Sequence, residues 1–468
     1  MAPDALGTDI TDASADPYVQ LAFSSTARRG GEPAALGAHA HQSRMLRVGA
    51  NFVNTVVGAG IVGLPHTLKR SGVALGLGMM VLACAGSHYS IRLLVRLSLE
   101  LRVTTYEQAC YAVFGRPGYV LVCASLLVFD FGACVSYLLI MTDAAARAVE
   151  QVWPALGPHD GAMREAVLFA HAPLLLALCL QRDLSALERW SAFSVALCIL
   201  LAAFVGWQYF ALDGALARAP DAPAAPPPAM RFASVGAASA FGTIAFSFVN
   251  TDTALLLFAT LRKPSEARWS LLSAASPGTS LAICGSFALL GYLTFRERCT
   301  DNLLNDYPSD TAAVFGMRAL YALSMALTYP TTFFVVRHVC NELAFAGNDG
   351  HASVQSNGAV RHVVLTLCIF GASFGLAAAR VQLGIVMALT GGCAGVIVAF
   401  VLPPALWLRC NRSGFSPWLF KNRGAVCASA VELGPALVML GFGVAMALLA
   451  PAQTVACAVA PERLPTFC

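Results

Sequence analysis

The sequence predicts an all-α polytopic membrane protein with eleven transmembrane helices. Of its 468 residues, 57% are hydrophobic and only 12% are charged, about half the charged share of an ordinary soluble domain. A soluble chain of this length would need about three domains with polar exteriors, and no part of residues 46–456 carries enough charge to cover them. Most of the chain is therefore expected to lie in lipid.

Eleven apolar runs are long enough to cross about 30 Å of hydrocarbon. Their approximate limits are 46–69, 73–97, 119–147, 165–181, 191–212, 233–258, 271–295, 313–345, 362–380, 382–409 and 432–456. The fourth run is short, and the ninth and tenth nearly meet at Arg380.

The runs divide the chain into five predicted parts. Residues 1–44 are polar and lack the basic and apolar regions of a signal peptide, which predicts a disordered cytoplasmic tail. Residues 45–409 are expected to form a ten-helix core, 410–431 a cytoplasmic loop, 432–456 the eleventh helix and 457–468 a short outer or luminal tail.

Basic residues indicate the orientation. With the N-terminus inside, more than half of the 30 lysines and arginines fall on the cytoplasmic side, which favours a cytoplasmic N-terminus and an outer or luminal C-terminus. The net charge of +4 has no clustered basic face, so a nucleic-acid partner is not expected.

Cysteine usage predicts no metal site. Most of the 15 cysteines lie within apolar runs, where cysteine behaves as a small hydrophobe, and no pair or cluster has metal-ligand spacing. Only Cys299, Cys457 and Cys468 fall on the predicted outer side, and a disulfide between two of them stays open.

The first apolar run is interrupted at its middle, in NFVNTVVGAGIVGLPHTLKRSG at 51–72. Gly58 and Gly60 permit non-helical backbone, and Pro65 removes one helical donor. Irregular backbone at membrane depth is tolerated only where it is buried in protein or lines a cavity. The freed amides of Gly58, Ala59 and Gly60 can bind a carboxylate, and freed carbonyls can bind a cation or an ammonium group.

Close helix packing is the alternative explanation, because small residues also let membrane helices approach each other. Asn51 and Asn54 lie one helical turn apart before the break. Polar amides at that depth need partners, which favours a binding site.

Five segments resemble the amino acid/auxin permease family, and most closely its sodium-coupled neutral amino-acid transporter branch. They are NTVVGAGIVGLP at 54–65, FGACVSYLLIMTD at 131–143, DNLLNDYPSD at 301–310, LTYPTTFFVVRHV at 327–339 and AFVLPPALWLR at 399–409. The resemblance covers residues 46–409 in the family's order.

The resemblance implies a leucine-transporter-like fold, with a 5+5 inverted repeat and a peripheral eleventh helix. It also implies a substrate site at mid-membrane between the first and sixth helices. The expected substrate-binding residues are Thr55, Gly58, Ala59 and Gly60 in the first helix and Phe246, Val249 and Asn250 in the sixth.

The sixth helix departs from the family. Relatives carry a polar cluster there, whereas this chain reads GTIAFSFVNTDTALLLFATL at 242–261. The run from Asn250 to Thr253 can mark an unwound turn, but no central glycine or proline fixes it.

For the coupling ion, the resemblance implies a sodium site between the first and eighth helices. Its ligands match the side chains of Asn54 and Thr328 and a backbone oxygen near Val57, and neutral oxygens suit a hard cation. Alternatively, Asn54 bridges helices and Thr328 bonds its own backbone.

Other ionisable groups suggest further roles. Asp130 lies near the middle of the third span, where a carboxyl is a functional or a hydrogen-bonded structural residue. His66, just past the break, is a proton carrier or an interfacial residue. The i, i+4 spacing of Asp143 and Arg147 predicts a surface ion pair.

The resemblance implies a secondary active transporter that carries neutral amino acids together with a cation, sodium, by alternating access. No enzyme constellation or nucleotide-binding loop is present, so no cofactor is expected beyond a coupling sodium ion or proton. The partners are an amino-acid substrate and the bilayer of the plasma, vacuolar or lysosomal membrane, with the monomer as the working unit. A proton-coupled transporter of an internal membrane and an amino-acid sensor that signals through its tail remain open.

Overall fold

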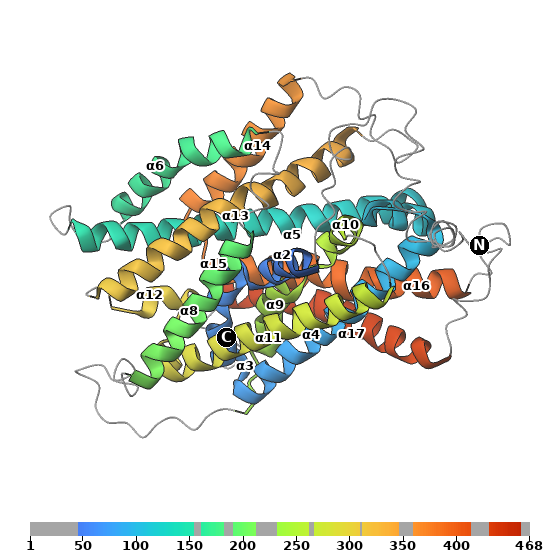
Figure 1. The fold of residues 1–468 in the computed structure, drawn as a ribbon, viewed down its shortest axis with the longest axis horizontal. Coiled ribbons are helices and arrows are strands. Elements are labelled where there is room, and N and C mark those ends of the chain that lie inside the picture. The colour runs from blue at the N-terminus through green and yellow to red at the C-terminus, as the bar shows by residue number, and fades with distance from the viewer. Residues whose placement is uncertain are drawn as a thin grey trace, which may run out of the picture.

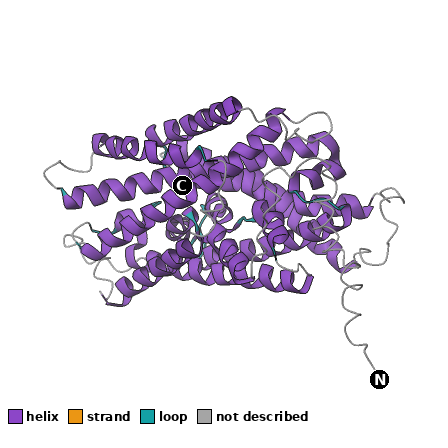
Figure 2. Cartoon of the chain, turned by 45° about the horizontal axis from the view of Figure 1, so that its top comes forward, coloured by secondary structure: helices purple, strands orange, loops and turns teal. Residues whose placement is uncertain are grey.

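The computed structural model describes residues 45–153, 161–181, 191–211, 232–261, 266–308, 311–345, 359–412 and 430–459. The predicted tail 1–44, most of the predicted loop 410–431 and residues 460–468 lie outside this part. Figure 2 shows that the described chain is built almost entirely of helices.

Within the described residues, eleven helices are long and apolar enough to cross a membrane, which confirms the predicted number. The elements run along the bundle in Figure 1. They are α2 (Met45–Val57), η1 (Ala59–Gly63), α3 (Leu64–Ser71), α4 (Val73–Leu101), α5 (Tyr106–Val152), α6 (Gly161–Cys179), α8 (Ser191–Ala211), α9 (Ala237–Phe248), α10 (Thr251–Thr260), α11 (Glu266–Phe295), η4 (Arg296–Arg298), α12 (Leu303–Asp306), α13 (Ala312–Phe345), α14 (Ala359–Ala378), α15 (Leu383–Thr390), η6 (Gly391–Gly395), η7 (Ile397–Val401), α16 (Leu402–Arg412) and α17 (Ala430–Val459).

The third span begins earlier than predicted. Helix α5 starts at Tyr106, where the Thr105 side chain accepts a hydrogen bond from the Gln108 amide, and it bends at Gly115, whose φ is 66°. The positive φ suits glycine, and Pro117 follows directly. The residues before the bend are therefore a helical approach to the span, which an apolar run alone does not reveal.

Helix α9 lies at the centre of the bundle (Figure 1) and packs against α3, α4, α15 and α17. Helix α9 comes close to the tenth span at a glycine, because a Cβ at Gly242 would lie 2.3 Å from the Ala388 carbonyl oxygen. The middle of the sixth span is thus held by backbone-to-backbone contact.

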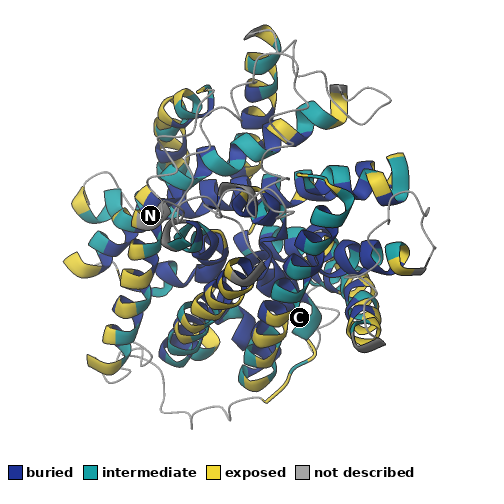
Figure 3. Cartoon of the chain, turned by 45° about the vertical axis from the view of Figure 1, so that its right-hand side comes forward, coloured by how far each residue is buried: buried dark blue, intermediate teal, exposed yellow. Residues whose placement is uncertain are grey.

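Figure 3 shows the buried residues gathered along the inner faces of the helices.

The segment from η4 to α12, residues 296–306, connects the seventh and eighth spans and makes polar contacts with other helices. Asp301 accepts a hydrogen bond from the Gly384 amide at 2.8 Å, which ties this segment to the start of α15. Arg318 of α13 is fully buried and donates to the carbonyl oxygens of Leu304 and Tyr307. Burial raises the pKa of the Asp301 carboxyl, and the bond from Gly384 opposes that shift.

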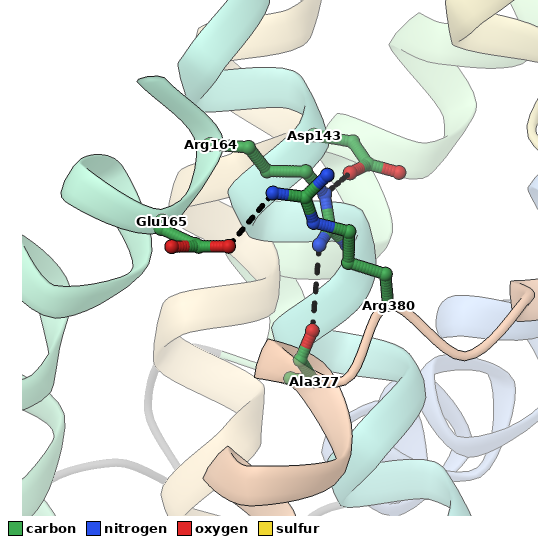
Figure 4. Close-up of polar contacts among 5 residues, drawn as sticks. All are labelled: Asp143, Arg164, Glu165, Ala377 and Arg380. Atoms are coloured by element: carbon green, nitrogen blue, oxygen red, sulfur yellow. Dashed lines mark hydrogen bonds and ion pairs between the residues drawn. The ribbon is translucent and has the colours of Figure 1, made fainter. Parts of the chain in front are cut away.

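The prediction of an ion pair between Asp143 and Arg147 is wrong. Figure 4 shows Asp143 bound to Arg164 of α6, with 2.6 Å between Nε and Oδ1. Arg164 also donates to the Ala377 carbonyl oxygen, and beside it Glu165 pairs with Arg380 at 2.7 Å. The i, i+4 rule considers one helix only, and a neighbouring helix supplied the partner.

Two of the cysteines predicted to lie on the outer side differ from each other. Cys299 is a buried free thiol, and burial raises its pKa. Cys457 is disulfide-bonded. The disulfide left open by the sequence therefore does not involve Cys299.

Candidate substrate and ion site

The first span is broken where the glycines predicted it. Helix α2 ends at Val57, Gly58 has a non-helical ψ of −133°, and a 3-10 helix, η1, follows from Ala59 to Gly63 before α3 begins. Gly58, Ala59 and Gly60 are all buried. The irregular backbone is therefore enclosed by protein, as membrane depth requires.

Two carbonyl groups freed by this break have donors from other spans. The Tyr321 hydroxyl of α13 donates to the Gly58 oxygen at 3.1 Å, and the Cys198 thiol of α8 contacts the Val57 oxygen at 3.6 Å. Sequence reasoning missed both residues, because a tyrosine and a cysteine in apolar runs give no distinguishing pattern. They place the fifth and eighth spans beside the break.

The sixth span is also broken, without glycine or proline at the break. Helix α9 ends at Phe248, Val249 is extended with ψ 124°, Asn250 has φ −147° and ψ 24°, and α10 begins at Thr251. Asn250 is held by the Ser87 hydroxyl of α4, which donates to its Oδ1 at 2.9 Å. Tertiary contact thus maintains a break that the local sequence marks weakly.

The two breaks lie against each other. A Cβ built at Gly60 would fall 2.1 Å from the Ser247 Oγ and 2.9 Å from the Ser247 Cα, in the last turn of α9. A Cβ at Gly58 would instead lie 3.2 Å from the Tyr137 hydroxyl of α5. The first break therefore has backbone of the sixth span on one side and a tyrosine on another.

Aromatic and small residues line the sixth break. The Phe246 ring lies 5.7 Å from the Phe129 ring of α5, centroid to centroid. A Cβ at Gly395 would contact Phe129 and the Val249 side chain. The structure thus brings Phe246, Val249 and Asn250 to one turn.

Thr55, the remaining predicted substrate-binding residue of the first span, is exposed, and its hydroxyl donates to the Phe52 carbonyl oxygen within its own helix.

The candidate ion ligands have different surroundings. Asn54 Oδ1 is buried and has no hydrogen-bond donor among the described residues. The Thr328 hydroxyl donates to the Ser324 carbonyl oxygen of its own helix at 2.8 Å. The Ser324 hydroxyl bonds Ser194 of α8 at 2.6 Å, so α13 is fastened to the fifth span here. No hydrogen bond joins Asn54 to Thr328 among the described residues.

Asp130 and His66 lie in separate environments. Asp130 is 4% exposed, and its Oδ2 has no hydrogen-bond donor in the described part of the chain. His66 lies on α3, one helical turn before Lys69 and Arg70. No hydrogen bond among the described residues joins Asp130 to His66.

Comparison with known proteins adds a second line of evidence. A family model described as transmembrane amino acid transporter protein matches residues 41–442. A Danio rerio protein, provisionally named sodium-coupled neutral amino acid transporter 11, is 30% identical over 369 residues, which are 77% of each chain. Its Bos taurus namesake is 27% identical over 88% of this chain and 86% of its own. Vacuolar amino acid transporter 2 of Saccharomyces cerevisiae is 24% identical over 78% of this chain and 76% of its own.

Proposed function

Because the chain belongs to the transmembrane amino acid transporter family, we propose that it is a secondary active transporter that binds an amino acid between its two broken spans and carries it by alternating access. Its relatives are named as transporters, a class without enzymatic chemistry. The observation that carries the proposal is the direct contact of the two breaks, Gly60 against Ser247.

The backbone at these breaks suits the two charged groups that every amino acid shares. The first backbone amides of a helix have no partner in a preceding turn, so those of η1, from Ala59 onward, could donate to a carboxylate. The last carbonyl groups of α9, which ends at Phe248, carry the negative end of a helix dipole and can accept from an ammonium group. The protein then needs no charged side chain to bind the carboxylate and ammonium groups of the substrate.

The arrangement also supports alternating access. Within the described residues, the first and sixth spans are each divided by a break into two helical halves, and each would be the first helix of one half of a 5+5 inverted repeat, with α17 as the peripheral helix. Rocking of one repeat against the other would then expose the shared site to each side in turn. A monomer suffices for this motion.

For coupling, we propose sodium symport with Asn54, Val57 and Thr328 as ligands. Asn54 offers an oxygen with no donor. The Thr328 hydroxyl and the Val57 carbonyl already take part in one contact each, but a hydroxyl or carbonyl oxygen retains a further lone pair for a cation. The names of the vertebrate relatives support sodium and suggest neutral amino acids as the first substrates to assay.

A proton-coupled transporter of an internal membrane is the second candidate. The buried carboxyl of Asp130 favours it, as does the similarity to a vacuolar transporter. The working membrane would then be vacuolar or lysosomal rather than the plasma membrane.

The test is uptake by the full chain in sealed vesicles with an imposed sodium or proton gradient. Sodium-driven accumulation above equilibrium, lost when choline replaces sodium, is the expected result. Accumulation that follows only a proton gradient would select the second candidate. Amino-acid binding without flux under either gradient would overturn transport and favour a sensor, whose signal should depend on residues 1–44.

A further inference from the structure

We propose that Asp130 and Asp252 form a recognition site for a positively charged side chain, so that the transported substrates include cationic amino acids such as arginine or lysine. This inference rests on the proposed transport function and names a substrate class for that site.

The two carboxyl groups come from spans that meet at the sixth break. Asp252 stands in the first turn of α10, two residues after Asn250, and α10 packs against both α5 and α2. Phe129, next to Asp130 in α5, lies 5.7 Å from Phe246 of the sixth span, ring centroid to ring centroid. Tyr137 lies about two turns after Asp130 on the same helix. The two carboxyl groups therefore share one region with the first break, which Tyr137 contacts.

Neither carboxyl has a basic partner among the described residues. Ion pairs between described residues are found at Glu432, Asp143 and Glu165, each with an arginine, and none of these includes Asp130 or Asp252. Two neighbouring carboxylates in a medium of low dielectric repel each other and cannot both stay ionised without a cation. A cation bound between the two carboxylates would therefore stabilise their ionised forms.

The number of unpaired oxygens argues for a cation with several donors. Asp130 Oδ2, Asp252 Oδ1 and Asn54 Oδ1 are all buried without a donor in the described structure. Asp130 is more than nine-tenths buried, so water does not replace the missing donor freely. One proton satisfies a single oxygen, whereas an ammonium group has three donors and a guanidinium five.

The separation between this pair and the first break also fits a long side chain. Asp130, Cys134 and Tyr137 are spaced i, i+4 and i+7, so they share one face of α5. Seven residues of helix span about 10 Å. A substrate whose carboxylate binds at Gly58 to Gly60 would therefore reach Asp130 with an extended lysine or arginine side chain, but not with a short neutral one.

The experiment compares arginine with citrulline, its neutral isostere, in vesicles containing the full chain. The wild type should take up arginine at least about tenfold more efficiently, because a buried carboxylate discriminates strongly against a ligand that lacks the matching charge. Asp130→Asn and Asp252→Asn should each bring the ratio of arginine to citrulline uptake close to one. Glu165→Gln, which removes a carboxyl from a half-exposed ion pair, should keep the wild-type ratio.

Each other outcome has a distinct meaning. Equal uptake of arginine and citrulline by the wild type would overturn the inference while leaving transport intact. Variants that change the sodium or proton dependence of both substrates equally would assign the pair to the coupling ion and also overturn it. Absence of any amino-acid flux would instead refute the proposed function. Should Asp130→Asn not fold, Asp252→Asn in the first turn of α10 provides the deciding measurement.

Discussion

Gly58 and Gly60 are two residues apart but have different neighbours. A side chain at Gly60 would meet the Cα of Ser247 at 2.9 Å, whereas one at Gly58 would meet the hydroxyl and ring edge of Tyr137. Backbone of a central helix cannot move aside, but a tyrosine side chain can shift. Packing thus explains Gly60, and substrate access remains the better explanation for Gly58.

Gly60→Val should therefore prevent accumulation of folded protein, because α9 would have to move. Gly58→Val should leave a folded protein without transport, because the new side chain fills the space at the break and restricts its backbone. Membrane yield, monodispersity in detergent and uptake measure the two effects. Gly285→Val is the matched control, since nothing lies within 4 Å of its Cβ. Normal uptake by Gly58→Val would refute the role of this break.

Asn54→Ala or Thr328→Ala should lower the apparent sodium affinity about 10- to 100-fold if both side chains bind the ion, at about 1.4 kcal/mol per tenfold. Substrate affinity at fixed sodium should weaken too, and higher sodium should partly restore it, because the two binding events are linked. The double variant should cost less than the sum of the single variants. Sodium titrations of uptake test this, and an additive double variant would speak against one shared ion.

At the scale of elements, the two breaks differ in how far the sequence predicts them. The first depends on local chemistry, Gly58 and Gly60 before Pro65, so the sequence located it to the residue. The sixth depends on contacts from other helices, such as Ser87 to Asn250 and Phe129 to Phe246, which no single-chain pattern contains. The same reason explains why Cys198 and Tyr321 were missed and why Asp143 was given the wrong partner.

The stability of the segment from η4 to α12 should respond to pH. Burial raises the pKa of Asp301 and of Asp306, so the folded chain retains protons that the unfolded chain has released. The pKa of an aspartate carboxyl in the unfolded chain is about 4. As the pH rises from this value through the higher pKa of the folded chain, these two groups lower the free energy of unfolding. Asp301→Asn keeps an oxygen for the Gly384 amide but cannot ionise.

Thermal unfolding in detergent between pH 4 and 7 tests this effect. The variant Asp301→Asn should lose less stability than the wild type as pH rises over this range. Glu165→Gln, in the half-exposed pair with Arg380, should follow the wild type. Parallel curves for all three proteins would show that Asp301 does not contribute to the pH dependence.

At the scale of the whole molecule, the number of spans and their core depend on apolar length and composition, and the sequence predicted both. Orientation is a separate matter, because it depends on charges in the connections. The proposed cytoplasmic N-terminus puts Asn411, the asparagine of the single N-x-S/T motif, Asn411-Arg412-Ser413, on the cytoplasmic side.

Asn411 should therefore carry no glycan in a eukaryotic host, since glycosyltransferases act on the opposite side of the membrane. Treatment with an endoglycosidase should leave the mobility of the protein unchanged. A new N-x-T site engineered between residues 457 and 468 is the matched positive control and should be modified. A glycan at Asn411 would reverse the proposed orientation.

The most direct test of the central claim is a structure of the full chain determined with a transported amino acid and sodium. The account predicts the substrate carboxylate within hydrogen-bond distance of the amides at Ala59 and Gly60, and its ammonium group at the carbonyl end of α9 beside Val249. The amino acid bound elsewhere, with Tyr137 still against Gly58 and Phe246 still against Phe129, would contradict the assignment of the two breaks as the substrate site.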